Sequence, residues 1–130
     1  MLLAVNIGNT NTVCGLFHED SLHGKGTAPT IAIRDAAACR SFIKNVLAGS
    51  KSDAADLHGI AIASVVPEAL AAVRQVCREC FSRDPLVITA GLDFGITINY
   101  ATPETLGADR VVNVAAAFDK YQKALIVVDA

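Results

Sequence analysis

The stretch LLAVNIGNTNTVCGLF, residues 2–17, decides the fold. Leu2 to Ile7 is a short apolar run, and Thr12 to Phe17 is a second run rich in residues that favour strands. Between them, residues 8–11 read Gly-Asn-Thr-Asn, which is typical of a tight turn. The stretch therefore predicts two strands joined in a β-hairpin.

Beyond the hairpin, the chain alternates between helices and strands. An extended segment is expected at Thr27 to Arg34, where Ile31 and Ile33 alternate with other residues, and Asp35 can cap the helix that follows. Apolar residues at helical spacing predict three helices, which lie before Gly49, after Pro67 and from about Ala108 to Tyr121. Further strands are predicted at Gly59–Val66, Leu86–Thr89 and Leu125–Asp129.

This order of elements predicts an α/β fold in which helices flank a mixed sheet. The chain has 130 residues, a net charge of −2 and 52% hydrophobic residues, which describes a globular domain and excludes disorder. It shows no clustered basic face of the kind that binds nucleic acid. The N-terminal apolar run is broken at Asn6 and Gly8, so it predicts neither a signal peptide nor a membrane span. We expect a cytoplasmic protein with reduced cysteines.

The hairpin turn is the first candidate site. Gly8 lets the backbone approach a ligand closely, while Asn9, Thr10 and Thr12 supply uncharged donors of the kind that hold phosphate oxygens. An ordinary hairpin turn explains the same residues.

The second candidate is PETLGADR, residues 103–110, at the start of the last predicted helix. The helix N-terminus favours an anion, Asp109 can act as a general base toward a hydroxyl, and Arg110 can grip a carboxylate with its guanidinium fork. A helix-start Asp beside a solvated Arg is the alternative. Asp129 follows a buried strand, where ligands and ions collect in open α/β sheets, and it can equally be a turn residue.

The cysteines and histidines are weaker candidates. Cys77 and Cys80 form a Cys-x-x-Cys pair, but they fall inside a predicted helix, which favours packing over a redox or zinc site. His18, His23 and His58 have no ligand spacing and are expected at the surface.

Taken together, five segments in order resemble the type III pantothenate kinases, the family that includes the Bvg accessory factors. They are Leu3–Val13, Ala63–Pro67, Thr97–Tyr100, Pro103–Arg110 with Val112–Ala117, and Ile126–Asp129. The resemblance implies two ribonuclease-H-like domains of the acetate and sugar kinase, Hsp70 and actin superfamily. It also implies ATP-dependent phosphorylation of pantothenate, the first step of coenzyme A biosynthesis, by a homodimer.

The resemblance further implies which residues bind the nucleotide and the ions. The hairpin segment would hold the ATP phosphates and Mg²⁺, and Asp129 would bind a monovalent cation, K⁺ or NH₄⁺. The residues of that hairpin segment are Asn6, Ile7, Gly8, Asn9, Thr10, Asn11, Thr12 and Val13.

For the second substrate, the resemblance implies that Tyr100 and the segment Gly107, Ala108, Asp109 and Arg110 bind pantothenate. Asp109 would accept the proton of the primary hydroxyl. Arg110 suits a substrate that carries a carboxylate.

The chain departs from the family in two ways. The family motif begins with Asp where this chain has Asn6, and an amide lacks the negative charge that holds hydrated Mg²⁺ near the phosphates. Family members also continue past Asp129 into a second domain. We therefore expect residues 1–123 to form the N-terminal kinase domain and residues 124–130 to form the first strand of a second, otherwise absent domain. That strand is expected to pair with the sheet edge or another chain, or to belong to a larger product.

These departures leave a second function open, a non-catalytic and dimerising domain that binds pantothenate or a nucleotide. A third hypothesis is thiol redox chemistry at Cys77 and Cys80.

Overall fold

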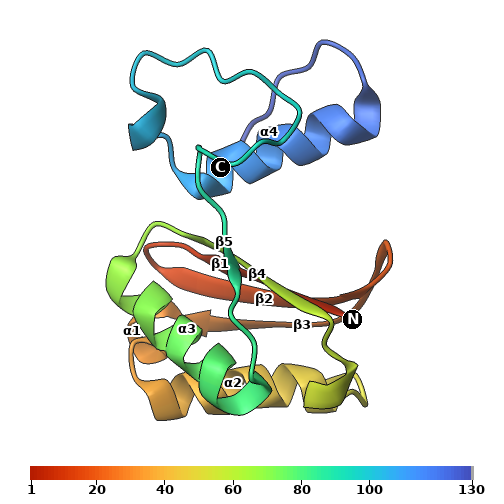
Figure 1. Ribbon diagram of the computed structural model, residues 1–130, viewed down its shortest axis with the longest axis vertical. Helices are drawn as coiled ribbons and strands as arrows, with labels where there is room; N and C mark the ends of the chain where they lie inside the picture. The colour runs from red at the N-terminus through yellow and green to blue at the C-terminus, as the bar shows by residue number, and fades with distance from the viewer. Residues whose placement is uncertain (130) are drawn as a thin grey trace.

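The computed structural model describes residues 1–129 and is built on a five-stranded sheet of order β3-β2-β1-β4-β5 (Figure 1). The first three strands are antiparallel neighbours, whereas β4 and β5 run parallel to β1. The strands are β1 (Leu2–Ile7), β2 (Asn11–His18), β3 (Ser21–Pro29), β4 (Gly59–Ser64) and β5 (Leu86–Val87). This mixed sheet confirms the predicted α/β class and is consistent with a ribonuclease-H-like domain.

Helices α2 and α3 cover one face of the sheet, and α4 lies on the other (Figure 1). None of the helices among residues 1–129 is long and apolar enough to cross a membrane. The helices are α1 (Thr30–Ile33), α2 (Ala36–Gly49), α3 (Pro67–Phe81) and α4 (Ala108–Tyr121), with short 3₁₀ turns at Ala54–Asp56 and Pro103–Thr105.

The core lies between the sheet and the pair α2 and α3. Successive strand residues point to opposite faces, so alternate residues of β1 enter this core while Ala4 and Asn6 face the side of α4. Asp35 caps α2 as predicted, since its Oδ2 accepts the N–H of Ala38 at 2.8 Å. The largest side chains of the core include Leu3, Ile7, Leu16, Ile43, Ile62, Val73 and Val76.

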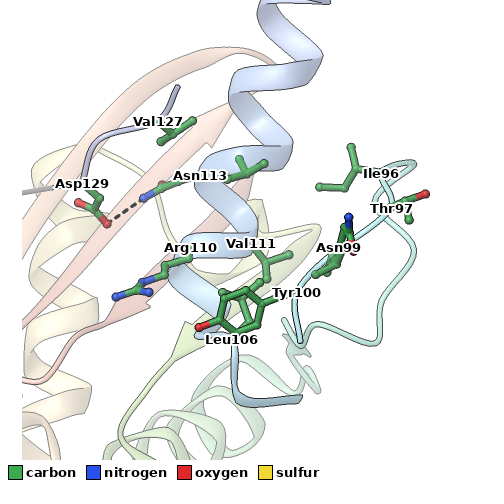
Figure 2. Close-up of a pocket in the computed structure, with 12 residues that line it drawn as sticks. Ile96, Thr97, Asn99, Tyr100, Leu106, Arg110, Val111, Asn113, Val127 and Asp129 are labelled. Carbon is green, nitrogen blue, oxygen red and sulfur yellow. Dashed lines mark hydrogen bonds between the residues drawn. The ribbon is translucent and has the colours of Figure 1, made fainter. Parts of the chain in front are cut away.

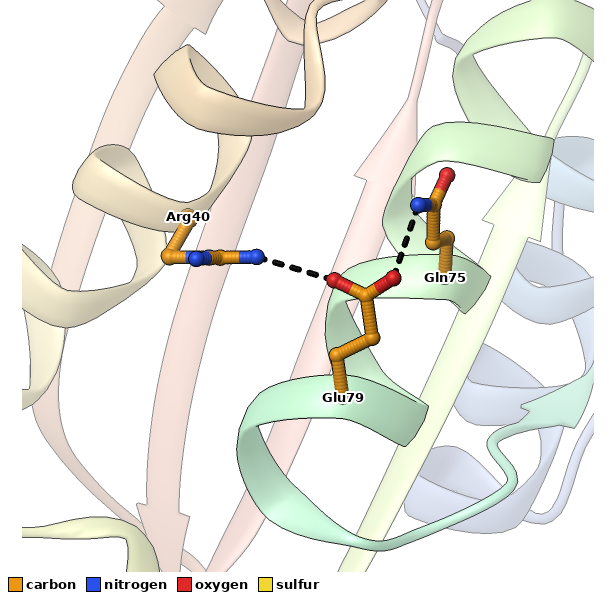
Figure 3. A network of polar contacts seen from close by, with 3 residues as sticks. All are labelled: Arg40, Gln75 and Glu79. Atoms are coloured by element: carbon orange, nitrogen blue, oxygen red, sulfur yellow. Dashed lines mark hydrogen bonds and ion pairs between the residues drawn. The ribbon is translucent and has the colours of Figure 1, made fainter.

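A polar contact joins α2 and α3 at the surface (Figure 3). Arg40 Nη2 lies 2.8 Å from Glu79 Oε2, and Gln75 Nε2 donates to Glu79 Oε1 at 2.8 Å. Both charged side chains are nearly half exposed, so the pair contributes at most about 1 kcal/mol. The buried apolar contacts therefore hold these helices together.

The third strand differs from its prediction. The strand begins at Ser21 and ends at Pro29, and the residues predicted to extend it to Arg34 form α1 instead. On a strand, Ile31 and Ile33 would share one face; here Ile31 is 70% exposed and Ile33 is 1% exposed. The mostly polar stretch of residues 21–24 also belongs to β3 and pairs with β2. β3 is an edge strand with a single neighbour, so it can form from a mostly polar stretch.

The final predicted strand is also absent from residues 124–129, which have no regular secondary structure. The prediction that this segment pairs with the sheet edge is not met, because the segment lies against α4. There, Asn113 Nδ2 donates to Asp129 Oδ2 at 3.1 Å. The strand predicted at Leu86–Thr89 is likewise shorter, although the N–H of Ile88 still donates to the carbonyl of Ile62 at 2.8 Å.

Cys77 lies in the core and Cys80 packs against it, as the sequence predicts for this pair. Cys14, Cys39 and Cys77 are buried and Cys80 is half-buried. Burial raises the pKa of Cys14 and Cys77 to about 12 and that of Cys39 to about 11. No group of three metal-binding side chains occurs in residues 1–129. The predicted surface histidines are all exposed.

The raised pKa values predict inert thiols, because the thiolate is the nucleophile. In the folded chain at pH 8, we expect iodoacetamide to modify Cys80 at most, and to modify all four cysteines in urea. Mass spectrometry of the alkylated protein measures this. Rapid labelling of Cys77 in the folded state would contradict this prediction and would support the redox function.

Candidate active site

The β1–β2 turn is fixed from beneath by one threonine. The N–H of Gly8 donates to the carbonyl of Asn11 at 3.0 Å and closes the turn. Thr30, the first residue of α1, donates its hydroxyl to the carbonyl of Gly8 at 2.7 Å and its N–H to the carbonyl of Thr10 at 2.8 Å. Asn9 and Thr10 are exposed, so their polar groups face outward from a turn whose backbone is held in place.

Thr12 does not have the predicted orientation. Its side chain is fully buried, and its Oγ1 lies 3.0 Å from Thr30 Oγ1. The Thr12 hydroxyl therefore supports the turn and is not a ligand donor. The sequence does not reveal the role of Thr30, because its pattern predicts an extended segment there. A threonine directly after Pro29 is the available signal.

Thr30→Val should destabilise the chain by about 1–3 kcal/mol, because it leaves the buried Thr12 hydroxyl and the half-buried Gly8 carbonyl without their partner. Urea unfolding followed by circular dichroism measures the change. Thr27→Val makes the same substitution at an exposed position on β3 and should change stability by less than about 0.5 kcal/mol. Equal effects of the two changes would show that Thr30 does not hold the turn.

Asp109 lies in the first turn of α4, where the helix dipole favours a negative charge. Its Oδ1 accepts the backbone N–H of Arg110 at 2.9 Å. A Cβ at Gly107, directly before the helix, would lie 2.5 Å from the same Oδ1. Glycine is therefore the residue that leaves room for this carboxylate.

Two pockets flank the start of α4. The first has a volume of about 470 Å³ and brings together the predicted residues Tyr100, Arg110 and Asp129 (Figure 2). The second has a volume of about 400 Å³, lies between α4 and the sheet, and brings together Asn6, Val13 and Asp109.

Other residues have places that the sequence did not predict. Lys25 lines the second pocket, and Asn113 lines both pockets. Ile7 and Ala108 are buried, so neither of these predicted residues presents its side chain to a ligand. The turn residues Gly8 to Asn11 line neither pocket.

With this geometry in place, comparison with known proteins assigns the family. The family model described as type III pantothenate kinase matches residues 2–130. The chain belongs to the type III pantothenate kinase family.

Curated type III pantothenate kinases match the chain along its whole length. The protein of Syntrophobacter fumaroxidans is 38% identical, over 99% of this chain and 50% of its own length. That of Anaeromyxobacter dehalogenans is 36% identical over 99% of this chain and 51% of its own. That of Syntrophotalea carbinolica is 37% identical over the same shares, 99% and 51%. The chain thus spans about half the length of these kinases.

Within residues 1–129, the oxygen donors at the candidate site do not complete a cation site by themselves. Asp129 offers one carboxylate, and one of its oxygens already accepts the Asn113 amide. Asn6 offers a neutral amide to the pocket that Asp109 lines. Hard cations take six or more oxygen ligands, often several carboxylates, and the described residues supply too few.

Proposed function

We propose that this chain is the part of a type III pantothenate kinase that binds the ATP phosphates and pantothenate. The reaction would be ATP-dependent transfer of a phosphoryl group to the primary hydroxyl of pantothenate, the first step of coenzyme A biosynthesis. The observation that carries the proposal is the carboxylate of Asp109, which Gly107 leaves room for in the first turn of α4. The side chains of Asp109 and Arg110 line two different pockets, which share Asn113, so a substrate that meets both must span the start of the helix.

In this proposal, Asp109 accepts the proton of the attacking hydroxyl as the O–P bond forms. A positioned general base contributes about 10²–10⁴-fold to a rate. Arg110 pairs with the pantothenate carboxylate through two parallel N–H donors, and Tyr100 lines the same pocket. Pairing at one end of the substrate fixes the hydroxyl at the other end, so Arg110 contributes through positioning.

The turn from Asn6 to Val13 would hold the phosphates of MgATP. Asn9 and Thr10 are exposed there, and the contacts of Thr30 fix the backbone. Phosphoryl transfer asks a protein mainly to position the groups and to neutralise charge, which a rigid polar turn can do.

Other parts of the assignment remain predictions. They are a monovalent cation at Asp129, a homodimer, a cytoplasmic location, and a boundary near residue 124 at which a second domain begins. The relatives are about twice as long as this chain, which leaves room in them for a second domain.

Asn6 favours a second function, a non-catalytic domain that binds pantothenate or a nucleotide. Calorimetric titration with pantothenate and with MgATP, followed by a coupled assay for ADP, separates the two. Binding with pantothenate-dependent ADP formation supports the kinase. Binding without turnover supports the second function, and no binding of either ligand contradicts both.

A further inference from the structure

Lys25 brings a positive charge to the second pocket, the one between α4 and the sheet. That pocket is otherwise lined mainly by small and apolar residues, with two asparagines and Asp109. Lys25 lies on β3 and is exposed, and no ion pair within residues 1–129 includes Lys25 or Asp109. The residues that line the pocket all lie between positions 4 and 113, before the segment that follows α4. The pocket therefore presents an unpaired cation to a ligand that enters it.

The register of the strands leaves a path from Lys25 toward the middle of the sheet. Lys25 pairs with Gly15 on β2, and Gly15 pairs with Ala4 on β1. Ala4 pairs in turn with Ala61 on β4. Residues that pair directly across strands point to the same face, and all four line the pocket. Because the partners of Lys25 are small, its aliphatic stem can lie over this row while its ammonium group stays in the pocket.

The reacting groups of the proposed reaction meet in the same pocket. Asp109 lines it and would accept the proton of the attacking hydroxyl, so the phosphoryl group that is transferred must lie close by. That group carries negative charge on its oxygens, and its transfer requires that the charge be neutralised. Asn6 offers only a neutral amide there. Among the side chains of residues 1–129 that line the pocket, Lys25 is the one that supplies positive charge.

We propose that Lys25 is a phosphate-binding residue whose ammonium group contacts the phosphoryl group transferred beside Asp109. The inference rests on the proposed function, in which ATP donates this group and pantothenate accepts it. Arg110 lines the other pocket and would hold the carboxylate end of pantothenate, so the two cations have separate roles. Removal of Lys25 should therefore affect a phosphorylated ligand and spare the unphosphorylated one.

Calorimetry with pantothenate and with its phosphorylated product tests this in the parent chain, Lys25→Met and Lys25→Arg. Lys25→Met removes a charge-assisted hydrogen bond, so it should weaken binding of the product about tenfold and leave binding of pantothenate unchanged. Lys25→Arg keeps the charge and should lose less. The loss should shrink at high salt, because salt screens exposed charges.

The matched control is Lys44→Met, which removes the same charge from an exposed position on α2, on the other face of the sheet. It should change neither affinity. A lysine on an edge strand can also serve only to discourage pairing between sheets, and it would then be indifferent to ligands. An unchanged affinity for the product in Lys25→Met, or equal losses for product and pantothenate, would overturn the proposal. If Lys25→Met lowers the helix and strand content in circular dichroism, Lys25→Gln replaces it.

A second measurement does not depend on pantothenate. Inorganic phosphate added to the ¹⁵N-labelled chain should shift the side-chain amide signals of Asn6 and Asn113, which line the same pocket. The shifts should be lost in Lys25→Met and kept in Lys44→Met. Shifts that require Lys25 in a chain that does not bind pantothenate would refute the proposed substrate but not the role of Lys25. Shifts of equal size in the parent and in Lys25→Met, or none in either, would refute that role.

Discussion

Asn6→Asp is expected to raise the rate of ADP formation from MgATP and pantothenate about ten- to a hundredfold. The Asn6 side chain is exposed at the pocket that Asp109 lines, so a carboxylate there would face the reacting groups. A carboxylate can hold the hydrated Mg²⁺ of MgATP near the phosphates, whereas an amide lacks the charge. Hydrogen bonds to charged groups contribute about 1.5–3 kcal/mol. A barrier lowered by that amount corresponds to a rate about ten- to a hundredfold higher.

The matched control is Asn9→Asp, which adds the same charge in the exposed part of the same turn. It should not raise the rate, because Asn9 lies outside both pockets. A coupled assay at saturating MgATP and pantothenate compares the three proteins. Equal and robust rates in the natural chain and in Asn6→Asp would refute the idea that Asn6 limits turnover.

Most of the fold could be predicted because its signals are local. The alternation of β1 and β2, the Asp35 cap and the proline that opens α3 each act within a few residues. The errors lie where pairing decides the outcome. β3 is a polar edge strand that its partner specifies, and the apolar segment 124–129 lacks a strand partner and lies along α4.

The site could be predicted only as a set of residue types at given positions. The sequence pointed to Asp109 and Arg110, and the structure places them in the first turn of α4. It did not reveal that Thr12 points inward, because a hairpin exposes alternate residues and the buried face depends on what packs beneath it. The contact of Asn113 could not be predicted either, since its partner, Asp129, is sixteen residues away in the sequence.

Gly107→Ala is expected to lower turnover about a hundredfold in the Asn6→Asp background while changing stability little. A Cβ at residue 107 would lie 2.5 Å from Asp109 Oδ1, so the carboxylate must move away from its place. A displacement of about 1 Å at a reacting group can cost about 10²-fold in rate. The coupled ADP assay measures the loss, and thermal unfolding should show a melting temperature close to that of the parent.

Gly49→Ala is the matched control, because a Cβ at the end of α2 would meet nothing within 4 Å. It should leave turnover unchanged and stabilise the helix by up to about 1 kcal/mol. A direct readout is the backbone amide of Arg110, which donates to Asp109 Oδ1 in the parent and should shift in the ¹H–¹⁵N spectrum of Gly107→Ala alone. An unshifted Arg110 amide would mean that the carboxylate keeps its place. That result would contradict the conclusion that Gly107 makes room for the Asp109 carboxylate, whatever the rate of ADP formation.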